Sequence, residues 1–240
     1  MTESEKRERL AKSEAKCPDR QWRSTCEDKE KGFSPRLDKN NQKSQLLIIG
    51  SITSLRGIEK GYYYTSSSND LWAMVDTMLG KKESGLFKRL QIRINQGKAT
   101  KEDFEKALED KGIEVCDIFK GCWFKNSTSS SDGDILDPII GYPDFTQYFD
   151  KEIWEAQKRN PELIIVINGT LTQRAFENAF PGLIEEKQNR IFTVFSPCRR
   201  NHILTNKIEL GKWARAFENA GFIEGKEERK SYLDAIQKDN

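Results

Sequence analysis

Four short apolar runs along the chain predict buried β-strands. Each run is continuous rather than alternating, so both faces of the strand are expected to be covered, as in a parallel sheet. Glycine, proline or polar residues follow the runs and mark their ends. The runs occupy residues 45–50, 113–119, 163–169 and 190–196.

Amphipathic segments between these runs predict helices. The clearest is residues 100–112, where Thr100 can cap the amino end, Asp103 occupies the third helical position and Gly112 ends the helix. Strands that alternate with helices predict an α/β fold with three α/β/α layers and a central, mainly parallel, four-stranded sheet. The other predicted helices cover residues 69–80, 145–160, 170–180 and 209–221.

The first 44 residues differ in composition from the rest of the chain. They are rich in charged side chains and poor in branched apolar residues. Such a segment has little apolar surface to bury, so residues 1–44 are expected to form a flexible or loosely helical extension. The folded domain is then expected to cover residues 45–240.

Composition excludes several classes of protein. The chain has 240 residues and no apolar run long enough to cross a membrane, so no membrane partner is expected. Its five cysteines form no CxxC pair, which favours a reduced, cytoplasmic location over a disulfide framework. The net charge of only +2 does not by itself indicate nucleic acid.

Metal and cofactor sites also find little support in the sequence. The single histidine, His202, excludes zinc sites with several histidine ligands, and the scattered cysteines give no strong metal pattern. No glycine-rich phosphate-binding motif follows any predicted strand. We therefore expect neither a metal nor a nucleotide cofactor.

Polar residues stand at the carboxyl ends of the predicted strands, the edge where parallel sheets bind their ligands. Ser51 follows the first strand, Asp117 lies in the second, Asn168 in the third and Ser196 in the fourth. Asp117 could accept a hydrogen bond from a ligand or cap the next turn. Asn168 could bind a ligand or form a turn with Gly169.

Five segments at these strand ends, taken in chain order, resemble motifs of the uracil-DNA glycosylase superfamily. The resemblance is strongest to the branches that remove hypoxanthine-type and mismatched bases, and it spans roughly residues 45–220. The segments are LLIIGSITS, GYYYTSSSNDLW, VCDIFKGCWFKNSTSSSDGDI, LIIVINGTLTQRAF and VFSPCRRN.

The resemblance implies a monomeric, monofunctional DNA glycosylase without metal or cofactor. Such an enzyme flips a damaged base out of DNA and hydrolyses its N-glycosidic bond, which leaves an abasic site. Asn69 matches an asparagine that the hypoxanthine-type branch uses in catalysis, so it is expected to position the attacking water. By its sequence context alone, Asn69 could equally be a helix cap.

The same resemblance implies a base-binding set. Tyr63 and Tyr64 match paired aromatic residues of the family, and one of them could stack on the extruded base, a contact worth about 1–3 kcal/mol. Either tyrosine could instead pack in the core. Tyr62 replaces a polar family residue and could line the mouth of the pocket. The expected base-binding residues are Ser51, Tyr63, Tyr64, Asp117 and Asn168.

Two loops are implied to contact DNA. The second-motif loop, residues 196–202, matches a loop that enters the minor groove in this superfamily, and its arginines suit phosphate contact or wedging. A serine-rich stretch, residues 127–131, is expected to approach the DNA backbone. The residues assigned to DNA contact are Ser129, Ser130, Ser196, Cys198, Arg199, Arg200 and Asn201.

Departures from the family motifs leave two alternatives open. In the first motif, LLIIGSITS, Thr53 replaces a proline and no Asp or Asn stands beside Gly50. In the second motif, VFSPCRRN, two arginines replace small residues. One alternative is a glycosylase for bulky modified bases, as in defence against phages with altered DNA. The other is a DNA-binding member of the same fold that has lost catalysis.

Overall fold

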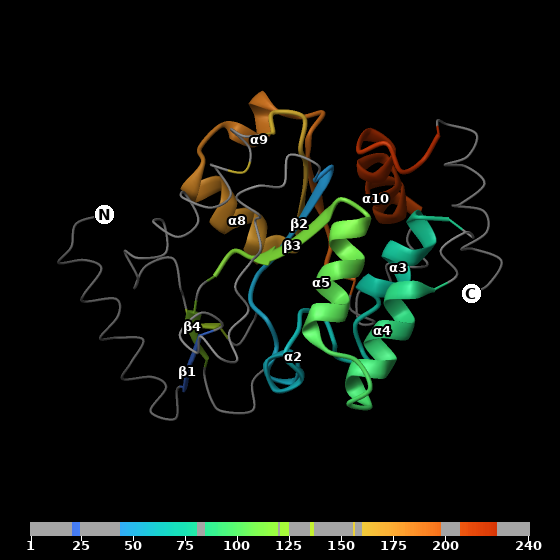
Figure 1. The fold of residues 1–240 in the computed structure, drawn as a ribbon. Helices are drawn as coiled ribbons and strands as arrows, with labels where there is room; N and C mark the ends of the chain where they lie inside the picture. Colours follow the sequence, from blue (N-terminus) through green and yellow to red (C-terminus); the bar gives the residue numbers. More distant parts are fainter. Residues whose placement is uncertain are drawn as a thin grey trace.

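The central feature of the fold is a parallel sheet of four strands (Figure 1). The computed structural model describes residues 21–24, 44–80, 85–119, 121–124, 135–136, 156, 160–197 and 207–224. The sheet order is β3-β2-β6-β7, and every neighbouring pair is parallel. Its strands are β2 (Leu46–Gly50), β3 (Ile113–Asp117), β6 (Ile164–Asn168) and β7 (Ile191–Val194). The predicted sheet is therefore confirmed.

Helices cover both faces of this sheet and complete the three layers (Figure 1). One face carries α3 (Leu71–Met78), α4 (Leu86–Asn95), α5 (Lys101–Asp110) and α10 (Lys207–Asn219). The other face carries α8 (Thr170–Ala179) and α9 (Leu183–Glu186). The short helix α2 (Leu55–Lys60) follows β2. Helices α2, α4 and α9 were not predicted, and most of the predicted helix 145–160 lies outside the described residues.

Two hydrophobic cores hold the layers together. Successive side chains of a strand point to opposite faces, so Leu46 and Ile48 of β2 enter one core while Leu47 and Ile49 enter the other. All four are fully buried, as expected for a strand in the middle of a covered parallel sheet. This arrangement explains why each strand was visible as a continuous apolar run.

A small antiparallel sheet lies outside this three-layer core. It has the order β1-β4-β5 and consists of β1 (Gln21–Ser24), β4 (Gly121–Phe124) and β5 (Ile135–Leu136). Strand β1 falls in the segment expected to be flexible or loosely helical. Its sequence QWRS carries no apolar run, and the strand exists through pairing with β4, far along the chain. Other residues of the 1–43 segment lie outside the described ranges.

Helix α4 begins with a cap supplied by another helix. Asp76 of α3 accepts hydrogen bonds from the backbone N–H groups of Phe87 at 2.9 Å and Lys88 at 2.8 Å. Gly85, which precedes the helix, provides no side-chain cap. Asp76 therefore satisfies two of the unpaired donors at the start of α4 and joins it to α3.

Removing this cap is expected to destabilise the protein. The variant Asp76→Ala should lower the free energy of unfolding by about 1–2 kcal/mol, because two amide groups at the start of α4 lose their acceptor. Chemical denaturation measures this change, and Asp110→Ala at the exposed end of α5 is the control. Equal stability in the two variants would contradict the capping role.

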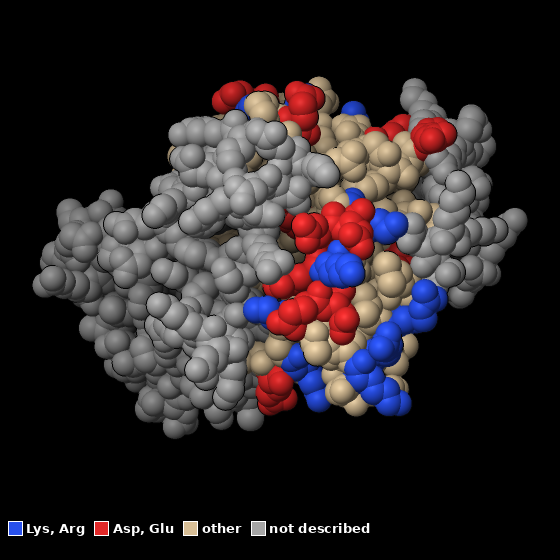
Figure 2. Space-filling view, viewed as in Figure 1, with Lys and Arg blue, Asp and Glu red and all other residues tan. Residues whose placement is uncertain are grey.

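Charge is segregated on the surface although the total is nearly balanced. Figure 2 shows acidic side chains gathered over α5 and basic side chains along the neighbouring α4. The exposed residues responsible are Glu102, Asp103, Glu109 and Asp110 of α5, and Arg89, Arg93 and the following Lys98 for α4. Helix α4 is therefore basic although the net charge of the chain is small.

Candidate active site

The candidate site lies at the carboxyl edge of the sheet, where three neighbouring strands end. Gly50 of β2 pairs with Asp117 of β3, and Asn168 ends β6 on the other side of β2. Tyr64 reaches this edge from the loop before α3, and its hydroxyl accepts a hydrogen bond from Asn168 Nδ2 at 3.0 Å. The structure thus brings together three of the predicted base-binding residues.

The absence of a side chain at Gly50 makes room for the tyrosine hydroxyl. A Cβ atom built on Gly50 would lie 2.0 Å from Tyr64 Oη and 3.1 Å from Asp117 Oδ1. Any residue other than glycine would therefore collide with the tyrosine. The hydroxyl of Tyr64 and the carboxylate of Asp117 therefore both lie close to Gly50 at the end of the central strand.

Asp117 also organises the loop after β2. Its Oδ2 atom accepts hydrogen bonds from the backbone N–H and the hydroxyl of Thr53, each at 2.6 Å, and both residues are buried. These bonds join the end of β3 to the loop after β2, which is neither of the two roles that the sequence left open. Proline has neither donor, so Thr53 makes two bonds that the family's first-motif proline could not make. The same loop is joined to β3, because Ser51 O accepts from the amide of Phe119.

Asn168 has one half of its amide occupied. Its Nδ2 atom binds Tyr64, whereas its Oδ1 atom is buried and has no hydrogen-bond partner within the described part of the chain. Gly169 follows with φ of 102°, a conformation that side chains disfavour, and donates its N–H to Val194 O at 2.8 Å. The turn after β6 therefore aims the chain into α8 and leaves a buried acceptor at the strand end.

Tyr62 and Tyr63 belong to the core rather than to this edge. Both side chains are 4% exposed, and the Tyr62 ring stacks on Phe104 with centroids 4.8 Å apart. Tyr63 packs edge-on against Tyr62 at 5.4 Å. Among the three tyrosines, Tyr64 alone extends to the strand ends, and the structure gives Tyr63 the packing role that the sequence left open.

Asn69 is the last residue of the tyrosine loop, residues 64–69. It lies where this loop meets the second-motif loop. Its Oδ1 atom accepts from the N–H of Leu71, the first residue of α3, at 2.9 Å, while Asp70 between them holds the N-cap position. Its Nδ2 atom has no partner among the described residues. The next residue, Asp70, donates its backbone N–H to Pro197 O at 2.8 Å. This bond places Asn69 beside the chain that leaves β7 at Ser196, which is half-buried.

The remaining DNA-contact predictions cannot be placed. The second-motif residues beyond Pro197 and the serine-rich stretch lie outside the described residues. This applies to Ser129, Ser130, Cys198, Arg199, Arg200 and Asn201.

Comparison with known proteins gives one sequence relative. The hypoxanthine DNA glycosylase of Methanosarcina acetivorans is 31% identical over 104 residues, which are 43% of this chain and 56% of that protein. Part of this chain is similar to a DNA glycosylase. The chain thus spans only about half the length of that relative. No protein-family model matches.

A solved structure also resembles the fold. It is the solution NMR structure of a candidate uracil DNA glycosylase from Methanosarcina acetivorans, with a TM-score of 0.46 and 20% identity. The alignment covers 75% of this chain and 93% of that one.

Residues that support the site were missed by the sequence analysis. Thr53 was noted only as a departure from the motif, and Gln91 on α4 was not considered. A signal existed, because Gln91 is a polar residue on the buried stripe of α4 formed by Phe87, Leu90 and Ile94. A buried amide at such a position needs partners, which come from the tyrosine loop.

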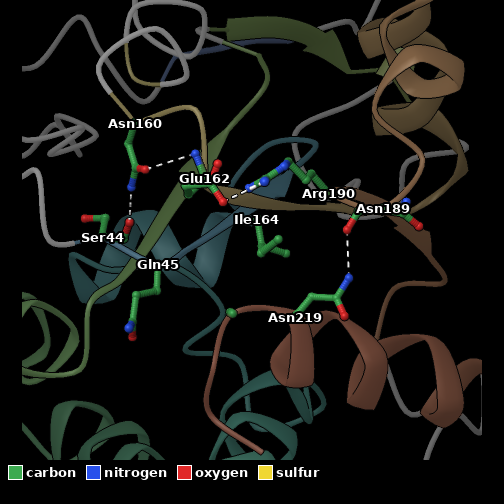
Figure 3. Close-up of a pocket in the computed structure, with 9 residues that line it drawn as sticks. Ser44, Gln45, Asn160, Glu162, Ile164, Asn189, Arg190 and Asn219 are labelled. Carbon is green, nitrogen blue, oxygen red and sulfur yellow. Dashed lines mark hydrogen bonds and ion pairs between the residues drawn. The ribbon is translucent and has the colours of Figure 1, made fainter.

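The sheet also carries a cavity at the opposite edge. It has a volume of about 770 Å³ and lies at the amino ends of β2, β6 and β7 (Figure 3). Its polar walls are bonded to each other: Arg190 pairs with Glu162 at 2.6 Å, and Asn219 donates to Asn189 O. This cavity is separate from the strand ends that carry the predicted site residues.

Two further observations concern the described residues only. None of their helices combines the length and apolar character needed to cross a membrane. No group of three or more histidine, cysteine or acidic side chains among them could hold a metal ion.

Proposed function

We propose that the protein is a DNA glycosylase that removes a deaminated base and leaves an abasic site. The proposal depends above all on one observation: Tyr64, Asp117 and Asn168 converge where three parallel strands end. This is the edge at which parallel α/β sheets bind ligands. The partial similarity to a hypoxanthine DNA glycosylase supports the same reaction class.

Base recognition is assigned to Asn168 and Tyr64. The buried Oδ1 atom of Asn168 has no partner, so it can accept a hydrogen bond from a ring N–H of an extruded base. Hypoxanthine and uracil carry such an N–H, whereas adenine and cytosine present a bare ring nitrogen at the corresponding position. A site with a buried acceptor therefore favours the deaminated base over its parent.

Hydrolysis is assigned to Asn69 and a bound water. The glycosidic bond breaks and the base leaves with its electron pair; water adds to the sugar C1′ and loses one proton, and the released base gains one, so that the products are a sugar hydroxyl and the free base. The free Nδ2 of Asn69 can hold that water, while its Oδ1 keeps the turn in place. A hydrogen-bonding amide can suffice here because the sugar cation forms largely by dissociation.

DNA binding is assigned in part to α4. Its exposed Arg89 and Arg93, with Lys98 beyond, form a basic surface on the helix that supports the tyrosine loop. Cations at such a position bind phosphates without regard to sequence.

A panel of DNA duplexes tests this function. Each duplex carries one hypoxanthine, one uracil, one bulky modified pyrimidine or no lesion, and abasic sites are detected by alkaline cleavage under single-turnover conditions. We expect hypoxanthine or uracil to be released at least about 10⁴-fold faster than adenine or cytosine, because a site built around a required hydrogen bond rejects a base that lacks the donor.

The panel also separates the alternatives. Binding to DNA without release of any base would replace this proposal with a DNA-binding protein that has lost catalysis. Release confined to the bulky base would favour an enzyme for modified phage DNA. Neither binding nor release would remove the glycosylase assignment altogether.

A further inference from the structure

We infer that Gln91 is a positioning residue whose side-chain amide holds the tyrosine loop, residues 64–69, in its working shape. Gln91 lies on α4, outside every motif of the resemblance. The loop carries Tyr64 at one end and Asn69 at the other. The kinetic part of this inference rests on the proposed function, whereas the structural part does not.

One amide group binds three carbonyls of the loop. Gln91 Nε2 lies 2.9 Å from Tyr64 O, 2.8 Å from Ser66 O and 3.2 Å from Asn69 O. The side chain is 2% exposed, so water does not compete for these bonds. An amide has only two N–H groups, so the longest of the three contacts shares a proton with another. The amide therefore draws both ends of the loop toward one point.

Asn95, one turn further along α4, extends the same contact. Its Nδ2 atom donates to Thr65 O and to Gln91 O, each at 2.7 Å. Four loop carbonyls, those of Tyr64, Thr65, Ser66 and Asn69, thus receive bonds from two side chains on one helix face. A backbone segment without regular structure is in this way satisfied by α4.

The loop needs this support because its own backbone is unusual. Tyr64 has φ of 53°, and among the described residues no other non-glycine has a positive φ. This conformation is unfavourable for a tyrosine and persists only where its surroundings impose it. It turns the Tyr64 side chain away from the core tyrosines and toward the strand ends. The bond from Gln91 to Tyr64 O acts at the strained residue itself.

The bonds come with a stability cost that packing alone does not explain. Gln91 Oε1 and Asn95 Oδ1 are both buried, and the residues that the structure describes offer neither a hydrogen-bond partner. The neighbouring buried positions of α4 are Phe87, Leu90 and Ile94, so an apolar residue would suit this face. Both side-chain amides leave their oxygen unpaired, which costs stability. Their presence on α4 therefore indicates that their N–H groups serve the loop.

The test compares Gln91→Met with control variants of the same helix. Methionine has similar length and volume but no donor. Ile94→Val and Ile94→Ala remove buried volume from α4 but no hydrogen bond to the loop, and their smaller and larger losses of melting temperature bracket that of Gln91→Met. The readouts are amide hydrogen exchange of Asn69, Asp70 and Leu71, the single-turnover rate of base release, and the Kd for lesion DNA.

We expect Gln91→Met to change the loop selectively. Exchange of the three amides should become at least tenfold faster, and the single-turnover rate should fall 10- to 100-fold with less than a threefold change in Kd. The Ile94 variant of equal melting temperature should leave both the local exchange and the rate near wild type.

A second variant gives a signature that a structural role would not produce. Gln91→Glu keeps the shape, but an ionised carboxylate repels the three carbonyls, whereas the protonated acid can donate one hydrogen bond to them. Its rate relative to wild type should therefore recover as pH falls. A relative rate independent of pH would contradict the donor role.

Failure of this inference differs from failure of the proposed function. If the wild type releases no base, the glycosylase assignment falls, yet faster exchange at residues 69–71 in Gln91→Met would still establish the loop support. If that exchange is unchanged, or if the matched Ile94 variant changes it equally, the inference about Gln91 is overturned whether or not the protein is an enzyme.

Discussion

The variant Asn69→Ala is expected to release bases about 100- to 1,000-fold more slowly than the wild type, the usual loss when a preorganised hydrogen bond to the reacting groups is removed. The Nδ2 atom of Asn69 has no partner among the described residues and is available to a water molecule. Alanine removes both this donor and the acceptor of the Leu71 amide. Single-turnover kinetics on the best lesion of the panel measures the effect.

A serine at the same position separates catalysis from capping. The hydroxyl in Asn69→Ser can still accept from Leu71 N–H, so the loss of stability should be only a few tenths of a kcal/mol, compared with about 1 kcal/mol for alanine. Both variants lack the amide nitrogen, so both should be slow. Full activity in either variant would assign Asn69 to capping alone.

The variant Gly50→Ala is expected to destabilise the protein by about 1–3 kcal/mol and to reduce base release strongly, because the added methyl group overfills a packed site. The new Cβ would lie 2.0 Å from Tyr64 Oη, so the tyrosine must leave the strand ends and its bond to Asn168 must break. Thermal denaturation and single-turnover kinetics measure the two effects.

A double variant tests the cause of this loss. In Gly50→Ala combined with Tyr64→Phe the clashing oxygen is gone, although the ring carbon that bore it would still lie 3.1 Å from the new methyl. The double variant should therefore be more stable than Gly50→Ala alone, and the two changes should be clearly non-additive. Additive losses would show that Gly50 acts through another contact.

The sheet could be predicted from the sequence because its physical cause is local. Each strand is covered on both faces, and this gives continuous apolar runs such as residues 46–49. Asp117 and Asn168 stood out as polar ends of such runs, and the structure places both beside Tyr64. Their nearness follows from the rule that parallel strands end at one edge.

The parts that were missed depend on contacts between distant residues. Helix α4 has no side-chain cap of its own, because Asp76 of α3 supplies the cap. The separation of Tyr64 from Tyr63 depends on a single positive φ, which a tyrosine adopts only under tertiary constraint. Strand β1 depends on its pairing with β4.

The bond between Asp70 N and Pro197 O joins two loops through backbone atoms alone. Because this bond needs no particular side chain, substitutions on either loop can alter the proposed base preference without breaking it. The sequences of the tyrosine loop and the second-motif loop can therefore change independently of each other. A new specificity could be selected by randomising side chains on both, while insertions beside Asp70 or Pro197 would break the link.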